Sequence, residues 1–473
     1  YSPPVAPGVA APESTYAFDL DGALETVSLP DSRQPTLAYE PTTGRLESAS
    51  IDRGSYVLAY DAVTGNVESI SDPEGGSLSY TYNGPLPTSE SYTGAAFSAV
   101  VDWVYDADLR VESESVNGSA GVSMTYNDDG QLLTAGEASF AYNSANGLLE
   151  SVNVGDVGLV VGSNGFGEIE SLSYSNSGGV IYEEVFAYDK LGRIESKTET
   201  FEGVSSVHEY AYDSRGRLAS ETIDSSLEAS WDYDANSNRE VTTPGAEVMP
   251  VYDAQDRLLE YGDLEFEYRE SGELKKKTDS QSGEVTLFDY EEMGNLLSVT
   301  LPDNTLIEYL HDARNRRVGK KVDGAFERRW IYGGQLNPIA EVDAAGIVVA
   351  RFVYGSRGHV PDYMVRGGQT YRFVTDHLGS VRAVVNAADG TVVQALEYDA
   401  WGVVLGDTNP GWQPFGYAGG LYEPATGLVR FGARDYLAEV GRWTAKEPLG
   451  FAATTSFYEY AGNNPVNLID VNG

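Results

Sequence analysis

The 473-residue sequence contains no cysteine. This excludes disulfide bonds and thiolate metal sites, but leaves the compartment open because exported bacterial proteins often lack cysteine. Histidine is scarce too, and the four residues His208, His311, His359 and His377 are scattered without ligand spacing. No metal and no other cofactor is therefore expected. The sequence also lacks an apolar run of the roughly 18 residues that cross a membrane, and shows no signal peptide.

Basic residues are few. The sequence has 31 lysines and arginines against 72 aspartates and glutamates, a net charge of −41. Nucleic acid is excluded as a partner because its phosphates require a basic surface. A solvated acidic exterior is the favoured interpretation, whereas a saline habitat or an acidic lumen holding a basic or unfolded guest are alternatives. One segment is rich in cations. We interpret it as a β-hairpin edge protected by positive charge, in preference to a phosphate-binding site. It comprises Arg314, Arg316, Arg317, Lys320, Lys321, Arg328 and Arg329.

A short motif recurs along most of the sequence. Tyr188-Asp189-Lys190-Leu191-Gly192-Arg193-Ile194 returns 24 residues later at Tyr212 as Tyr-Asp-Ser-Arg-Gly-Arg-Leu. Further copies begin at Tyr39, Tyr60, Tyr105, Tyr126, Tyr142, Tyr233, Tyr252, Tyr268 and Tyr290, with weaker ones near Phe18 and Asn164. Where no copy is missing, neighbouring tyrosines lie 16 to 24 residues apart. Such a fixed period predicts a repeat architecture.

Each copy has the chemistry of a β-hairpin. Tyrosine and the aliphatic residue suit strands. Asp-x-x-Gly between them suits a tight turn, because Asx side chains bond nearby backbone and glycine accepts a positive φ. Helical spacing is absent over any long stretch, so we predict a nearly all-β chain of antiparallel hairpins. The pattern leaves two architectures open, a propeller of about 40–45 residues per blade and one continuous spiralling sheet.

The length favours an array over one large core, because single cores stop growing near 250–300 residues. We expect a proline-rich N-terminal arm over residues 1–15, either extended or left over from processing, and repeats over residues 16–331. From residue 332 onward the repeat changes character, and tryptophan and glycine become frequent. Residues 332–473 are therefore expected to form a distinct closing domain.

This last segment carries long, specific motifs. They are Thr375-Asp376-His377-Leu378-Gly379-Ser380, Tyr398-Asp399-Ala400-Trp401-Gly402, Gly441-Arg442-Trp443, Glu447-Pro448-Leu449-Gly450, Tyr458-Glu459-Tyr460, Asn464-Pro465 and Asp470-Val471-Asn472-Gly473. Their order resembles the core of the rearrangement-hotspot/tyrosine-aspartate (RHS/YD) repeat family, which includes ABC-toxin C components, polymorphic Rhs toxins and teneurins. The resemblance covers residues 16–473. It implies a continuous spiralling antiparallel sheet that forms a hollow shell, capped by a core domain that curls inward.

The same resemblance implies self-cleavage of the aspartic-protease type just after the core. The two catalytic carboxylates would be Glu447 and Asp470, supported by Lys446 and Arg442, with the cut near Asn472 and Gly473. Such chemistry needs one ionised and one protonated carboxyl group close together. The sequence departs from the family twice, because Glu447 replaces an aspartate and Val471 replaces a proline. Read without the resemblance, Asp470 to Gly473 is simply a turn and Glu447 is a surface acid before a proline.

Two functions follow as hypotheses. In the first, the shell is a structural container for a C-terminal toxin or effector polypeptide, and at most cleaves itself rather than turning over a substrate. In the second, it is a teneurin-like adhesion or recognition module without cleavage. The expected partners are the chain's own effector and a delivery or N-terminal capping protein. The expected location is secreted or on a bacterial cell surface.

Overall fold

The computed structural model describes residues 13–473 except 95–96, 244–245 and 453. The proline-rich arm therefore lies almost wholly outside the described residues. The described chain is nearly all β, with antiparallel pairing between successive strands and only four short 3-10 turns, so the predicted fold class is confirmed. No helix in the described part has the length and apolar character to cross a membrane. The chain divides into two compact units, each described separately below.

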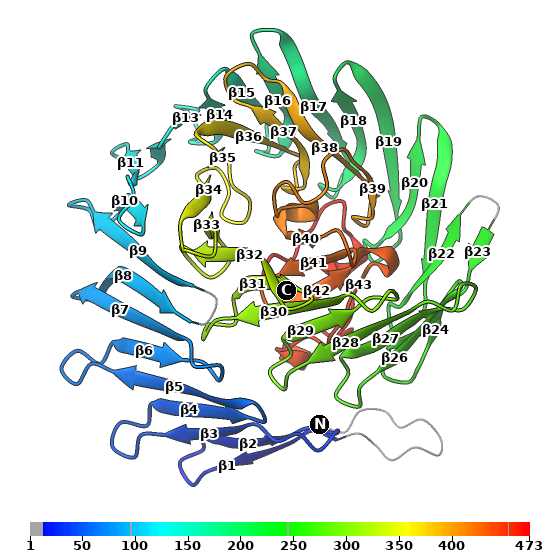
Figure 1. The fold of residues 1–473 in the computed structure, drawn as a ribbon. Coiled ribbons are helices and arrows are strands. Elements are labelled where there is room, and N and C mark those ends of the chain that lie inside the picture. Colours follow the sequence, from blue (N-terminus) through cyan, green and yellow to red (C-terminus); the bar gives the residue numbers. More distant parts are fainter. Residues whose placement is uncertain (1–12, 95–96, 244–245, 453) are drawn as a thin grey trace. The chain divides into compact units, whose positions relative to one another are not determined.

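Unit 1 comprises residues 1–121, 251–349 and 444–454. Its first ten strands form successive antiparallel hairpins, drawn in blue in Figure 1. These strands are β1 (Thr15–Phe18), β2 (Leu24–Ser28), β3 (Thr36–Tyr39), β4 (Leu46–Ile51), β5 (Gly54–Tyr60), β6 (Val67–Ser71), β7 (Ser77–Asn83), β8 (Leu86–Thr93), β9 (Ser98–Tyr105) and β10 (Val111–Val116). Its second run is β24 (Val251–Tyr252), β25 (Leu258–Tyr261), β26 (Leu264–Tyr268), β27 (Leu274–Asp279), β28 (Val285–Tyr290), β29 (Leu296–Thr300), β30 (Leu306–His311), β31 (Arg317–Val322), β32 (Ala325–Tyr332) and β33 (Pro338–Val342). The 3-10 turn η3 (Gly450–Ala452) belongs to this unit as well.

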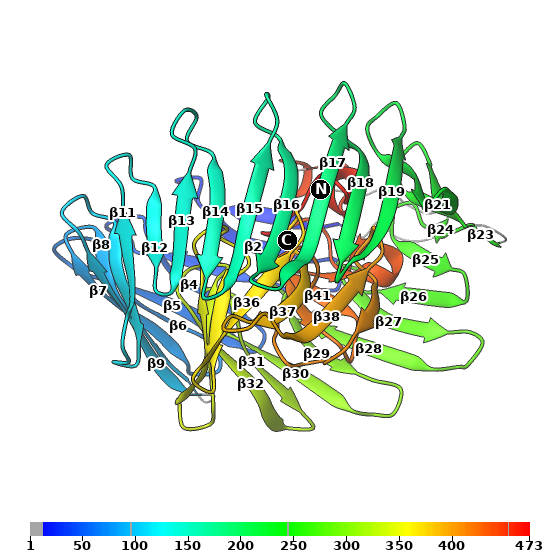
Figure 2. The same cartoon turned by 90° about the horizontal axis from the view of Figure 1, so that it is seen from above.

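Unit 2 comprises residues 122–250, 350–443 and 455–473, and β34 (Val348–Val353) crosses the boundary into it. Its first strands stand side by side in Figure 2. They are β11 (Val122–Tyr126), β12 (Leu132–Ala135), β13 (Ala138–Tyr142), β14 (Leu149–Val154), β15 (Val157–Ser163), β16 (Ile169–Asn176), β17 (Gly179–Tyr188), β18 (Ile194–Phe201), β19 (Val204–Tyr212), β20 (Leu218–Ile223), β21 (Ser226–Tyr233), β22 (Arg239–Thr243) and β23 (Ala246–Val248). The later strands are β35 (Tyr363–Arg366), β36 (Gln369–Thr375), β37 (Val381–Asn386), β38 (Val392–Tyr398), β39 (Val404–Asp407), β40 (Leu421–Glu423), β41 (Leu428–Phe431), β42 (Arg434–Leu437) and β43 (Arg442–Trp443). Three 3-10 turns, η1 (Tyr417–Gly419), η2 (Ala438–Val440) and η4 (Ala461–Asn463), complete the unit.

The turn of each repeat is built as its chemistry predicts. Between β17 and β18, the Asp189 carboxylate accepts the N–H groups of Leu191 and Arg193 at 2.8 and 3.1 Å. Gly192 lies at φ +76°, a conformation that glycine adopts without strain. The Arg193 guanidinium returns to Asp189, and this ion pair recurs in the turns of the other repeats that combine Asp with Arg four residues on. Aspartate therefore fixes both the turn and the arginine that follows it.

The arginine also contacts the next repeat. Arg193 lies 4.4 Å above the ring of Tyr212, and Arg217 lies 4.2 Å above the ring of Tyr233. Such cation–π contacts contribute about 0.5–1 kcal/mol at partly exposed sites. The motif thus links neighbouring hairpins through side chains as well as through the sheet.

The repeat tyrosines form a second link that periodicity alone did not reveal. Ten tyrosine hydroxyl groups donate to a backbone carbonyl of the preceding hairpin, at or near its aliphatic position. The pairs are Tyr39 to Leu24, Tyr60 to Leu46, Tyr82 to Val67, Tyr105 to Pro87, Tyr142 to Leu132, Tyr188 to Ile169, Tyr212 to Ile194, Tyr233 to Leu218, Tyr332 to Arg317 and Tyr398 to Val381, at 2.5–3.1 Å. Tyrosine is therefore required for its hydroxyl group as well as for its ring.

Replacing Tyr212 by phenylalanine should lower the free energy of unfolding by about 1–2 kcal/mol. The Tyr212 hydroxyl donates to the Ile194 carbonyl at 2.6 Å and accepts from the Asn467 amide at 2.7 Å, and both hydrogen bonds are lost in the variant. Urea denaturation would measure the change. Tyr371→Phe is the control, since its hydroxyl donates to the exposed Gln369 side chain and to no other group among the described residues. An equal loss in both variants would contradict a specific role for the repeat hydroxyl.

The cation cluster near residue 320 does not guard an edge, so that prediction is wrong. Strand β31 pairs with β30 on one side and β32 on the other. The arginines instead neutralise buried acids, as when Arg316 binds Asp312 at 2.7 Å and Glu90 of β8 at 2.6 Å. A buried carboxylate needs such a partner to remain charged, so these ion pairs tie β8 to the second run of strands in unit 1.

The core of unit 2 is aromatic. One hydrophobic cluster contains the buried aromatic side chains Phe352, Phe373, Phe415, Tyr417, Phe431, Tyr436, Trp443 and Tyr460. Most ring pairs within it meet edge to face or tilted, for example Tyr436 and Tyr460 at 4.3 Å between centroids. These geometries suit the ring quadrupoles. The tryptophan- and glycine-rich sequence after residue 332 thus builds the packed interior of this unit.

Candidate functional site

The predicted catalytic residue Asp470 lies in the last turn of unit 2. One carboxylate oxygen accepts the N–H groups of Asn472 and Gly473 at 3.2 and 3.0 Å. The other accepts from the buried Arg434 guanidinium at 3.3 Å. Arg434 is itself held in place, because it lies 4.2 Å over the ring of Trp443 and donates to the Phe457 carbonyl. Asp470 thus faces one fixed cation.

The predicted cleavage vicinity, Asn472 and Gly473, is held in a narrow slot. The Asn472 carbonyl accepts the Ala433 N–H at 2.7 Å. Gly432 lies directly beside that carbonyl at φ +35°, and a side chain there would collide with it. Gly473 is buried against the same turn between β41 and β42, whereas the Asn472 side chain is exposed. The turn between β41 and β42 therefore holds the backbone of Asn472 and Gly473 by a hydrogen bond and by close packing.

Arg442, a predicted supporting residue, is also in unit 2. Its guanidinium donates to the Asn238 side chain at 3.3 Å and lies 5.8 Å from the ring centre of Tyr458. Its backbone pairs with that of Glu459. Arg442 thus joins β43 to the β21–β22 turn and to the segment after residue 455.

Glu447 and Lys446 belong to unit 1. Glu447 is half-buried, and its carboxylate accepts the Leu449 N–H at 3.1 Å. The Lys446 ammonium donates to the Gln255 side chain at 3.2 Å. Burial, aided by the nearby Arg257 guanidinium, lowers the pKa of Lys446 to about 8. Glu447 thus occupies a turn, and its pairing with Asp470 in the other unit stays a prediction.

Sequence reasoning missed a buried charge network in unit 2. Lys197 of β18 binds Glu184 of β17 at 3.1 Å and Glu199 at 2.9 Å. Glu184 also accepts the backbone N–H of His377, and Glu199 pairs with Arg382 of β37. The network therefore joins β17 and β18 to the segment around residues 376–382. Its only sequence signal is Lys-x-Glu at alternate positions of a strand, which puts both charges on one face.

Electrostatic coupling keeps this network ionised. Burial alone would raise the pKa of Glu184, but Lys197 and His377 hold that pKa well below its ordinary value. Burial likewise opposes the charge of Lys197, yet Glu184 and Glu199 raise its pKa well above the ordinary value. Removing one partner would leave an uncompensated buried charge.

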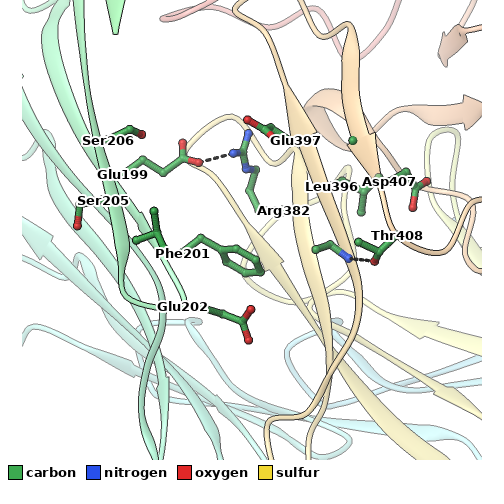
Figure 3. A pocket seen from close by; sticks show the side chains of 13 residues that line it. Glu199, Phe201, Glu202, Ser205, Ser206, Arg382, Leu396, Glu397, Asp407 and Thr408 are labelled. Carbon is green, nitrogen blue, oxygen red and sulfur yellow. Dashed lines mark hydrogen bonds and ion pairs between the residues drawn. The ribbon is translucent and has the colours of Figure 1, made fainter. Parts of the chain in front are cut away.

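Two adjoining cavities lie beside this network. The larger, about 790 Å³, lies between β18–β19 and β38–β39 and is lined by Phe201, Glu202, Asp407 and Thr408, among others. Figure 3 shows Glu199 and Arg382 facing each other in this cavity. The smaller, about 290 Å³, reaches toward β20 and the segment around residue 376. The described residues contain no cluster of three or more acids and histidines suited to a metal ion.

Asp399 lines the smaller cavity and should make stability depend on pH. Burial raises the pKa of its carboxyl to about 6 from an ordinary 3.8, against two backbone hydrogen bonds that lower it. Between these values the folded protein holds a proton that the unfolded chain has lost, so stability falls as pH rises. Above about pH 6 the folded state carries the full cost of the buried charge.

Asp399→Asn is therefore expected to raise the free energy of unfolding by about 1–2 kcal/mol at pH 7.5 and to have no effect below pH 4. The turn should survive, because the asparagine oxygen can accept the Trp401 and Val403 N–H groups as the aspartate does. Urea denaturation at both pH values measures this. Asp343→Asn, in an equivalent turn, is the control. A gain at pH 4 equal to that at pH 7.5 would contradict the assignment.

Comparison with known proteins assigns the family. The family model for the teneurin YD-shell matches residues 8–466. The chain belongs to the teneurin YD-shell family. Teneurin-3 of Danio rerio is 24% identical over 96% of the chain, and teneurin-4 of Mus musculus is 25% identical over 93%. The tRNA3(Ser)-specific nuclease WapA of Bacillus spizizenii is 24% identical over 76% of the chain. The chain spans only 15–17% of the length of these relatives.

Solved structures show the same YD-shell fold. The chain matches the TcdB2-TccC3 structure with a TM-score of 0.64 and 16% identity, over 97% of this chain and 28% of the solved one. The TcdB2-TccC3-Cdc42 structure gives a TM-score of 0.64 over 97% of this chain and 27% of that one, also at 16% identity. The predicted RHS/YD membership and its fold are thus confirmed.

Proposed function

We propose that this chain is the wall of a hollow β-shell that encloses a C-terminal toxin or effector polypeptide. The observation that carries the proposal is the teneurin YD-shell match, which runs through the repeats and most of the core, over residues 8–466. The fold shared with TcdB2-TccC3 supports it. Such a shell would be secreted or displayed on a bacterial cell surface. The partners would be the effector itself and a delivery or capping protein.

The finer part of the proposal is self-cleavage after the core by Glu447 and Asp470. In this chemistry one carboxylate activates water while the other, protonated, polarises the scissile carbonyl. The Arg434 guanidinium donates to the Asp470 carboxylate at 3.3 Å and so holds one of the two acids in a fixed orientation. The slot beside Gly432 supports the proposal too, because it fixes the backbone next to the expected cut. This step opens one peptide bond by adding one water molecule.

The test is a chain extended beyond Gly473 by the polypeptide that its gene encodes there. A denaturing gel should show two fragments, and mass spectrometry should place the cut within a few residues of Gly473. Asp470→Asn and Glu447→Gln should each leave the chain whole, at least 100-fold slower in cleavage. Asp389→Asn, in an exposed turn of the same unit, should cleave normally. A chain that stays whole without any substitution would rule out self-cleavage.

A teneurin-like recognition module is the second candidate. The departure of Glu447 from the family's aspartate favours it, as do the matches to teneurins, which cover 93–96% of this chain. An uncut extended chain, together with saturable binding to a cell surface, would support this candidate over the container.

A further inference from the structure

The two cavities of unit 2 have an unusual charge balance. The smaller one is lined by six carboxylates and two permanent cations, and the larger adds two more carboxylates. The six are Glu199, Glu221, Glu228, Asp376, Glu397 and Asp399, and the two more are Glu202 and Asp407. The cations are Lys197 and Arg382, and both bind Glu199. The carboxylates of the two linings therefore outnumber their permanent cations by eight to two, and Arg382 attracts Asp376 as well as Glu199.

Two of these carboxylates are deeply buried yet only partly satisfied. Asp376 is 6% exposed, and one of its oxygens accepts the backbone N–H groups of Leu378 and Ser380. Glu221 is 4% exposed, and one of its oxygens contacts the His208 ring at 3.1 Å. Since a carboxylate has about four acceptor positions, each retains capacity on the side of the cavity.

Tyr210 supplies an independent observation. Its side chain lines the smaller cavity and is only 8% exposed, and within the described part of the chain its hydroxyl makes no hydrogen bond. Burial raises the pKa of Tyr210 far above its ordinary value, so the hydroxyl stays neutral. Buried tyrosine hydroxyls normally have a partner. Because Tyr210 lines the smaller cavity, its hydroxyl is available to a ligand there.

The size and position of the cavities favour a polypeptide. A cavity of about 290 Å³ has room for one long side chain, and the adjoining 790 Å³ falls within the range of ligand pockets. Phe201 offers an aromatic face in the larger cavity. Strand β39, which supplies Gly406 and Asp407, pairs with β38 alone in the described structure and leaves one edge open to another strand.

We propose that these cavities bind a basic segment of polypeptide, with its guanidinium or ammonium group held by Glu221, Asp376 and Tyr210. The backbone of the segment would lie in the larger cavity along β39. If the proposed function holds, this segment belongs to the enclosed effector, so that part of the inference rests on the proposed function. The preference of the cavities for a cationic side chain is independent of it.

The experiment uses the full chain and an acetylated, amidated five-residue peptide with one central arginine. Matched peptides carry citrulline, which keeps the shape and loses the charge, or glutamate. Calorimetry or saturation-transfer NMR should show the arginine peptide binding at least ten-fold more tightly than the citrulline peptide, with no binding of the glutamate peptide. Binding should weaken with added salt, as expected for charge recognition.

Three variants locate the site. Asp376→Asn and Tyr210→Phe should each weaken arginine-peptide binding about five-fold. Glu397→Gln, which lines both cavities from the exposed surface, should weaken it about two- to three-fold without disturbing the fold. The control is Glu195→Gln, an exposed acid of β18 that lies outside both cavity linings.

Equal binding of the citrulline peptide, no binding of the arginine peptide, or equal loss with Glu195→Gln would each overturn the proposal. Because a free peptide is the probe, failure here leaves the self-cleavage result untouched. Conversely, a chain that never cleaves can still bind the peptide, so the two failures are distinguishable.

Discussion

Replacing Lys197 by methionine is expected to lower the free energy of unfolding by about 3–5 kcal/mol. Lys197 is the common partner of Glu184 and Glu199, and all three side chains are buried. Methionine fills a similar volume but removes the cation that Glu184 and Glu199 share, and Glu199 alone keeps a second one, Arg382. Urea denaturation at neutral pH, monitored by tryptophan fluorescence, would measure the loss.

Two further variants show whether the loss comes from uncompensated charge. Adding Glu184→Gln to Lys197→Met should restore part of the stability, because the uncompensated buried charge of Glu184 is removed. Lys276→Met removes a cation from an exposed ion pair with Glu267 and should cost less than about 1 kcal/mol. If Lys276→Met and Lys197→Met had equal effects, the buried network would have no special role.

Replacing Gly432 by alanine should destabilise the end of the chain by about 2–5 kcal/mol. A Cβ there meets the Asn472 carbonyl directly, and overpacking of this kind costs about 1–3 kcal/mol. The φ of +35° adds about 1–2 kcal/mol of backbone strain for a residue with a side chain. The last turn, Asp470 to Gly473, should therefore leave its slot.

Hydrogen exchange at the Ala433 amide, which donates to Asn472, reports this release directly. Gly427→Ala is the matched control, because Gly427 lies at φ +71° with open space where its Cβ would be. It should lose about 1 kcal/mol and keep the Ala433 amide protected. Fast exchange in both variants would show that backbone strain, and not the collision with Asn472, releases the last turn.

The hairpins were predictable because their determinants are local. Tyr188, Asp189 and Gly192 specify a strand end, a side-chain-bonded turn and a positive φ within five residues. The same logic holds where glycine is replaced, as at Leu109 and Asp256, which adopt the left-handed conformation at φ +65° and +60°. The surrounding hydrogen bonds impose this positive φ on residues whose side chains disfavour it.

The contacts between distant segments were not predictable. The partner of Asp470 is Arg434, and that of Glu184 is His377, nearly two hundred residues along the chain. No local pattern in a single sequence marks such pairs. The candidate catalytic pair came from the family resemblance alone, and neither spacing nor composition would have selected Glu447 or Asp470 from 72 acidic residues.

The tyrosine bonds have a consequence for how this kind of protein can change in length. The hydroxyl groups described above donate to the hairpin before them, so this part of a repeat's bonding involves its neighbours in the sequence. A whole unit of about twenty residues could be duplicated or deleted, and every remaining tyrosine would still find a carbonyl to bond. A repeat could therefore be added by duplication without changes to the sequences of the other repeats.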